Sequence, residues 1–136
     1  MNAEDIIYSA LVLDQKSSNL LKRYLKTYVS FKYENIFCHH VTIFYGKHYM
    51  IPENLGQEFI IQPNFLYANE NAACITLRNL PFWTKENPHI TLGCKFGVKP
   101  AYSNHLIKIT NSLEDVHHLG NLSGKIGVFT NAGWIY

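Results

Sequence analysis

The sequence has few of the compositional extremes that assign a protein to a class by themselves. Only 16% of its 136 residues are charged, and 12 Lys and Arg against 10 Asp and Glu give a formal net charge of +2. This charge is too small for a polybasic coat that binds nucleic acid, although it does not repel a small anionic ligand. With 47% apolar residues, the low hydrophobicity and high charge of disordered chains are absent. We therefore expect a single domain over residues 1–136.

Long apolar runs are absent as well. A run such as residues 6–13 is far shorter than the roughly 18 to 20 residues of a membrane-spanning helix. Glu4 and Asp5 precede this run, where a secretory signal would carry positive charge. These features predict a cytoplasmic protein without a membrane partner.

Cysteines are too few and too scattered for a structural framework. Cys38, Cys74 and Cys94 are odd in number and form no Cys-x-x-Cys pair, so neither a set of disulfides nor a zinc knuckle is indicated. A zinc site built from Cys38, Cys94 and either His39 or His40 has no ligand spacing to support it. We expect buried, reduced cysteines, no metal and no cofactor.

Apolar periodicity predicts more strands than helices. Runs of β-branched and aromatic residues indicate strands, whereas apolar residues at helical spacing indicate two helices, the first capped by Ser17 or Ser18. Within one strand, Pro63 predicts an edge or a bulge. Since strands do not alternate regularly with helices, a parallel doubly wound sheet is disfavoured and an α+β fold is predicted. The predicted strands cover residues 6–13, 38–45, 58–67, 72–79, 89–94, 125–129 and 134–136, and the predicted helices cover about 18–28 and 103–109.

Two short segments share one pattern, in which an apolar residue separates a histidine from a threonine. They are His40-Val41-Thr42-Ile43 and His89-Ile90-Thr91-Leu92, and each falls in a predicted strand. Because residues i and i+2 of a strand share a face, each segment presents an imidazole beside a hydroxyl. Two such strands facing across a groove would bring two imidazoles and two hydroxyls to one site.

This set of side chains suits acid–base catalysis at phosphorus. Imidazole exchanges a proton near neutral pH because its unperturbed pKa is about 6.5. In-line cleavage of a phosphodiester needs a base at the attacking oxygen and an acid at the leaving oxygen. Threonine hydroxyls can bond the non-bridging oxygens, on which negative charge builds in the transition state. We therefore predict that the catalytic residues are His40, Thr42, His89 and Thr91.

The two segments resemble the signature of the two-histidine (2H) phosphoesterase superfamily, which consists of two H-x-[TS]-x motifs with apolar neighbours. This superfamily includes bacterial 2′-5′ RNA ligase-like proteins, plant and fungal cyclic phosphodiesterases, and viral enzymes that cleave 2′-5′ oligoadenylates or cyclic dinucleotides. Asn87-Pro88 before the second motif is also similar to the family pattern. The resemblance implies a bilobal α+β fold in which two pseudo-symmetric antiparallel sheets flank a central groove, with helices outside. It also implies metal-independent hydrolysis of a cyclic or 2′-5′ phosphodiester.

Substrate contacts are predicted from position and residue type. Strand alternation places Phe44 on the face of His40, and turns His39 and Tyr45 to the opposite face, so His39 is interpreted as structural. Aromatic rings that border the groove can stack on a base, and a lysine can meet a phosphate. The predicted substrate-binding residues are Phe44, Tyr45, Trp83, Lys95 and Tyr102, of which Lys95 shares the face of His89 and Thr91 if its strand extends that far.

The sequence leaves several functions open. The candidate substrates are 2′,3′-cyclic phosphates on RNA ends, 2′-5′ oligoadenylates, and cyclic di- or oligonucleotides. The first would serve RNA processing or nucleotide recycling, and the other two would serve evasion of host defence in the host cytoplasm if the protein is viral. The alternatives are a non-catalytic module that binds RNA ends or nucleotides in the same groove, and an unrelated α+β domain with accidental motifs. No obligate protein partner is indicated.

Overall fold

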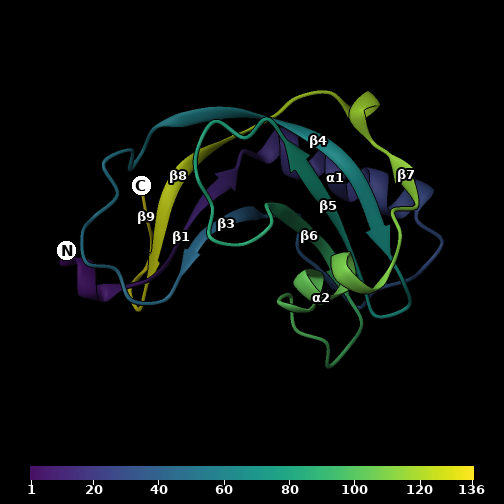
Figure 1. The fold of residues 1–136 in the computed structure, drawn as a ribbon, viewed down its shortest axis with the longest axis horizontal. Coiled ribbons are helices and arrows are strands. Elements are labelled where there is room, and N and C mark those ends of the chain that lie inside the picture. The colour runs from purple at the N-terminus through teal and green to yellow at the C-terminus, as the bar shows by residue number, and fades with distance from the viewer.

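The strands form one connected, antiparallel sheet, and two α-helices accompany it in the computed structural model, which describes residues 1–136 (Figure 1). This arrangement confirms the predicted α+β class. Neither helix is long and apolar enough to cross a membrane. In chain order the elements are η1 (Ala3–Asp5), β1 (Ile6–Leu13), α1 (Gln15–Tyr28), β2 (Asn35–Ile36), β3 (His40–Tyr45), β4 (Glu58–Ala68), β5 (Ala72–Arg78), β6 (His89–Cys94), α2 (Tyr102–Ile109), β7 (Glu114–Asp115), η2 (His117–Leu119), β8 (Leu122–Thr130) and β9 (Gly133–Ile135).

The strand order is β7-β4-β5-β6-β3-β1-β8-β9, with β2 paired to β6 and a further pairing between β4 and β8. Figure 1 shows the result as an arch, with β1, β3 and β8 on one side and β4, β5 and β6 on the other. The two sides are joined twice: β3 and β6 share the single residue pair Val41 and Ile90, and β4 pairs with β8. The two motif strands are therefore neighbours at the centre of the sheet.

The first helix begins at Gln15 rather than at about residue 18. Asp14 is its N-cap, and the Asp14 carboxylate accepts a hydrogen bond of 2.8 Å from the backbone N–H of Ser17. The first backbone N–H groups of a helix have no partner within the helix. Because an aspartate directly after the last residue of β1 can accept hydrogen bonds from them, the helix starts without a loop. Ser17 is buried instead, and its hydroxyl accepts a hydrogen bond from the backbone of Ser123.

The main core lies between the sheet and α1. Leu21 and Leu25 of the helix belong to the same buried cluster as Val41, Ile90 and many other apolar strand residues. Val41 and Ile90 are both 0% exposed. Because side chains alternate across a strand, the residues on either side of this pair point away from the core.

Bulges in β4 and β3 interrupt the regular alternation of side chains between the two faces of the sheet. The register of β4 shifts between Pro63 and Leu66, which confirms the bulge or edge predicted at Pro63. Between β1 and β3, Ser9 pairs with Phe44 and Ala10 pairs with Thr42, so Ile43 is an extra residue. The expectation that Phe44 shares a face with Thr42 is therefore wrong, since one inserted residue reverses every later side chain.

The three cysteines are all buried, as expected, and their thiols are free. Cys38 belongs to the main core, whereas Cys74 and Cys94 belong to a smaller cluster with Leu106 of α2. Burial raises the pKa of all three thiols, which keeps them protonated and unreactive near neutral pH. These cysteines therefore act as small apolar core residues.

We expect Gly124→Ala to destabilise the fold by about 1–3 kcal/mol, a typical cost of an added carbon in a packed site. A Cβ at Gly124 would overlap the carbonyl oxygen of Val12 and lie 3.0 Å from Cγ of Leu11. The free energy of unfolding, measured by urea denaturation, checks this. Lys125→Ala, at an exposed position of the same strand, is the control and should stay within about 0.5 kcal/mol of the natural protein. Equal stability of the two variants would contradict the close approach of β1 and β8.

Candidate active site

The Val41–Ile90 pair brings the two His/Thr motifs to one face of the sheet. Since both paired side chains are fully buried, the four motif residues beside them point to the opposite face and are each half-buried. His40 and Thr42 flank Val41 as His89 and Thr91 flank Ile90. His40 and His89 lie close enough for the charge of His89 to contribute, in addition to burial, to the lowered pKa of His40. The structure thus brings together the four residues that the sequence predicted to be catalytic.

The ring orientation of His89 is fixed by the backbone. Its Nδ1 lies 2.8 Å from the carbonyl oxygen of Asn87. A carbonyl only accepts, so Nδ1 carries the proton and donates it. In the neutral imidazole, Nε2 then has a free lone pair. His89 is therefore prepared to accept a proton through Nε2.

His40 has a different partner, which the sequence analysis placed wrongly. The Nδ1 atoms of His39 and His40 lie 2.9 Å apart, so one ring donates to the other. Strand alternation would have put them on opposite faces. Instead, Cys38 has a left-handed backbone with φ 50° and β3 starts only at His40.

A local insertion explains the position of His39. The backbone N–H of Cys38 donates to the carbonyl of Thr91 at 3.0 Å, and the next cross-strand pair is Val41 with Ile90. Thr91 and Ile90 are adjacent in β6, but their partners Cys38 and Val41 are separated by two residues, His39 and His40. Extra residues of this kind re-aim side chains near sites. An adjacent His-His pair before a strand was the available sequence signal.

The two threonine hydroxyls, like the two histidines, have different hydrogen-bond partners. The Thr91 hydroxyl lies 2.8 Å from Oγ of the buried Ser103 at the start of α2, and 3.4 Å from the carbonyl oxygen of Pro100. Both of these partners belong to the protein, and the Thr91 hydroxyl is positioned to donate its single proton to the Pro100 carbonyl. The Thr42 hydroxyl has no hydrogen-bond partner in the chain. Thr42 is the hydroxyl that is free to donate to a bound anion.

Burial holds both site imidazoles in the neutral form near pH 7. It lowers the pKa of His40 to about 4, with smaller contributions from the neighbouring His39 and His89. Burial also lowers the pKa of His89, partly offset by the Asn87 carbonyl and the Glu86 carboxylate. A bound anion between the rings would oppose this effect, because it favours the charged form of both.

Aromatic rings surround His40. The ring of Tyr8 lies 5.5 Å from that of His40 and also 5.5 Å from that of Tyr45, on which it stacks. Trp134 of β9 lies 5.9 Å from His40 and 5.5 Å from His39. The bulge at Ile43 is what brings Tyr45 to this face. Sequence reasoning named Tyr45 but missed Tyr8 and Trp134, because neither is close to a motif in the sequence.

Phe44 and Trp83 lie apart from the aromatic rings around His40. Their rings are 6.4 Å from each other, and the Lys85 ammonium lies 5.0 Å from the Phe44 ring. Trp83 is 68% exposed. This group borders the loop that leads into β6, on the side to which the bulge turned Phe44.

Lys95 and Tyr102 lie at the turn between β4 and β5. The β6 strand ends at Cys94, so Lys95 lies beyond it and its backbone N–H donates to the carbonyl of Asn71. The Tyr102 hydroxyl accepts hydrogen bonds from the side chains of Asn69 and Asn71, at 3.1 and 3.3 Å. The structure assigns both residues contacts that hold this turn.

No group of three or more His, Cys, Asp or Glu side chains gathers in the way that a metal site requires. Cys38 and Cys94, which the zinc alternative would join, lie in different apolar clusters.

No protein-family model matches this chain, and no curated protein matches it by sequence. The chemistry of the site therefore has to be argued from its geometry.

We expect the free energy of unfolding to decrease as the pH falls from about 6.5 toward 4, the pKa of His40 in the fold. The unfolded chain binds the proton more tightly than the folded one, so protonation favours unfolding in this window. Each pKa unit corresponds to about 1.4 kcal/mol. Urea denaturation at several pH values measures the effect.

In His40→Gln, the decrease over this window should be smaller than in the natural protein. His118→Gln, at an exposed position, is the matched control and should keep the full decrease. If the His40 variant showed the same pH dependence as the control, His40 would not be held neutral by its surroundings.

Proposed function

We propose that the protein is a metal-independent phosphodiesterase that hydrolyses a cyclic or 2′-5′ nucleotide phosphodiester with His40 and His89 as the acid–base pair. One observation carries this proposal. The pairing of Val41 with Ile90 in the buried core gathers two imidazoles and two hydroxyls on one face. These are the groups that in-line displacement at phosphorus needs.

The hydrogen bonds to the rings suggest which histidine has which role. His89, with Nδ1 held by the Asn87 carbonyl, offers the free Nε2 as base to the attacking water. The Nδ1 atoms of His40 and His39 are hydrogen-bonded, so His39 can accept the Nδ1–H of a protonated His40 and leave the Nε2–H of His40 free for the substrate. Protonated His40 is then the acid, and His39 is a positioning residue.

The reaction balances without a further reactant. Water loses a proton to Nε2 of His89 while its oxygen forms a bond to phosphorus. The bond from phosphorus to the ribose oxygen breaks, and that oxygen takes the proton from His40. The Thr42 hydroxyl donates to a non-bridging oxygen, where charge increases. Binding of the anionic phosphodiester raises the pKa of both rings and so supplies the protonated His40.

The arrangement of strands is compatible with the bilobal fold of the 2H phosphoesterases. We assign the lobes to β7-β4-β5-β6 and β3-β1-β8-β9, which are joined at the Val41–Ile90 pair and again through β4 and β8. The motif strand of each lobe lies at this junction. The rings of Tyr8 and Trp134 beside His40, and the ring of Tyr45 stacked on Tyr8, offer surfaces on which a base can stack.

We expect His40→Ala and His89→Ala each to lower kcat/KM by about 10²–10⁴, the usual contribution of a general acid or base. The assay separates products from three substrates by chromatography: a 2′,3′-cyclic nucleotide, a 2′-5′ oligoadenylate and a cyclic dinucleotide. EDTA should leave the rate unchanged. His105→Ala, at an exposed position of α2, is the control.

The pH profile of kcat/KM, which reports the free enzyme, should be bell-shaped, with its maximum below about pH 6.5 because the pKa of both rings is lowered in the protein without substrate. The two apparent pKa values would belong to the pair. Binding of a substrate that is released unchanged would indicate the non-catalytic nucleotide-binding module instead. Full activity of the double His40→Ala/His89→Ala variant would refute both the roles and the site.

The threonines provide a sharper comparison. Thr42→Val should lower kcat by about 10² or more, because it removes a donor aimed at the developing charge. Thr91→Val should lower kcat less, because the Thr91 proton already serves Ser103 or Pro100. The two variants change the same atoms in matched motifs, so kinetic constants compare them directly. Equal effects would mean that Thr91 is released from Ser103 when substrate binds.

A further inference from the structure

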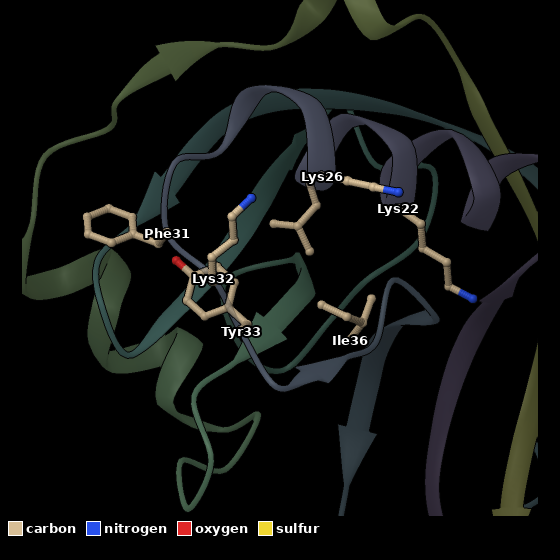
Figure 2. Close-up of a pocket in the computed structure, with 7 residues that line it drawn as sticks. Lys22, Lys26, Phe31, Lys32, Tyr33 and Ile36 are labelled. Atoms are coloured by element: carbon tan, nitrogen blue, oxygen red, sulfur yellow. The ribbon is translucent and has the colours of Figure 1, made fainter.

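A second site lies between α1 and the segment that follows it. It is a pocket of about 500 Å³ lined by Leu25 and Lys22 of the helix, among others, and by an opposite wall that includes Phe31 and Ile36. Figure 2 shows Lys22 and Lys26 on α1, and Phe31, Lys32, Tyr33 and Ile36 on the segment that follows the helix. None of its residues belongs to the His/Thr motifs.

The charge of this pocket is of one sign. Lys22, Lys26 and Lys32 line it, and no acidic residue does. None of the three ammonium groups has a carboxylate within 4.0 Å, since the single ion pair of the protein joins His117 and Asp115. Lys22 and Lys26 are also an i, i+4 pair of like charge, which costs stability until a counter-charge is bound. The pocket is therefore complementary to an anion.

The nearest acidic residue in the same segment is held elsewhere. A carboxylate oxygen of Glu34 accepts a hydrogen bond of 2.7 Å from the backbone N–H of Phe96. This contact turns the carboxylate toward the loop after β6. The positive charge of the three lysines is therefore left without an internal partner.

One wall of the pocket is rigid. The Tyr33 hydroxyl donates to the carbonyl of Asn69 at 2.6 Å and lies 3.1 Å from that of Ala72. The Tyr33 ring lies so close to Gly93 that an added Cβ would be 3.0 Å from it. Beside this wall, Phe31 and Ile36 are 38% and 47% exposed. A flat apolar group, such as a nucleobase, fits next to fixed and accessible surfaces of this kind.

The chain connects the pocket directly to the histidine pair. Ile36 ends the pocket wall, and His40 follows four residues later in the sequence, a span of at most about 14 Å. β2 pairs with β6 and with no other strand, and β1 ends at Leu13, so no strand lies on the other side of Ile36. Lys22 lines the pocket and is also near His39, where its charge, after burial, lowers the pKa of the imidazole.

We propose that this lysine pocket binds a phosphate and base of the single-stranded oligonucleotide whose scissile phosphodiester lies at His40 and His89. The inference rests on the proposed function and narrows its substrate to oligonucleotides that extend beyond the cleaved linkage. Lysine ammoniums contact the backbone without reading its sequence, and Phe31 provides a ring for one base. Because α1 covers the face of the sheet opposite to the four motif residues, the oligonucleotide strand passes around the irregular connection between β2 and β3, beside His39 and Lys22, to reach the pocket.

Fluorescence anisotropy with a labelled single-stranded DNA of about ten nucleotides measures binding to the pocket. DNA has no 2′ oxygen, so it contains no 2′-5′ or 2′,3′-cyclic linkage that the protein could cleave during the measurement. Lys26→Gln/Lys32→Gln should weaken binding about tenfold and reduce the salt slope by about 1.4, since each phosphate contact contributes about 0.7. Lys16→Gln/Lys108→Gln removes the same charge at exposed positions outside the pocket and should weaken binding less than about twofold.

Steady-state hydrolysis kinetics separate oligonucleotide binding in the lysine pocket from catalysis by the two histidines. In Lys26→Gln/Lys32→Gln, KM should rise for an oligonucleotide substrate but stay unchanged for a 2′,3′-cyclic mononucleotide. His105→Ala, at an exposed position of α2, should bind the DNA as the natural protein does. If the natural protein cleaves none of the substrates but the binding result holds, the pocket is supported and only the catalysis fails.

Three outcomes would overturn the pocket. The first is equal loss of DNA affinity in the two double variants, which would mean that total charge alone drives binding. The second is unchanged affinity in Lys26→Gln/Lys32→Gln. The third is binding to vesicles that contain phosphatidylserine with no binding to DNA, which would assign the lysines to a membrane surface.

Discussion

The pairing of two fully buried side chains, Val41 and Ile90, determines the geometry of the candidate site. This pair joins β3 to β6 and belongs to the core that α1 covers. With both apolar side chains held inside, alternation along each strand sends the neighbouring histidines and threonines to the opposite face. The core and the site thus lie on opposite faces of the sheet at the same strand pair, and a change in register would move all four motif residues together.

The two motifs have the same residue pattern but different surroundings, and this difference is what suggests distinct roles. A backbone carbonyl fixes the tautomer of His89, whereas Nδ1 of His40 is hydrogen-bonded to a second imidazole that can either donate or accept. Likewise, one threonine hydroxyl is bound to Ser103 and the other has no partner in the chain. Because each imidazole nitrogen is defined by what the other nitrogen bonds, a base and an acid can arise from identical side chains.

The short connection between β2 and β3 links the site to the lysine pocket. Two inserted residues, His39 and His40, and the left-handed Cys38 change the direction of the chain there. On one side of this turn the chain forms a wall of the pocket, and on the other it carries a histidine of the site. The irregular backbone therefore places two differently charged surfaces within a few residues of each other, as bulges near functional sites often do.

The sequence by itself determined the α+β class, most of the strands and the four motif residues, because strand periodicity and the His/Thr spacing are local properties. It could not determine that Ile43 and His39 are inserted residues, since a bulge exists only relative to a partner strand. For that reason Phe44 and His39 were assigned to the wrong faces, and Tyr8 and Trp134 were missed. The tautomers, the unequal threonines and the pocket were likewise decided by contacts between distant segments, which only the tertiary structure brings together.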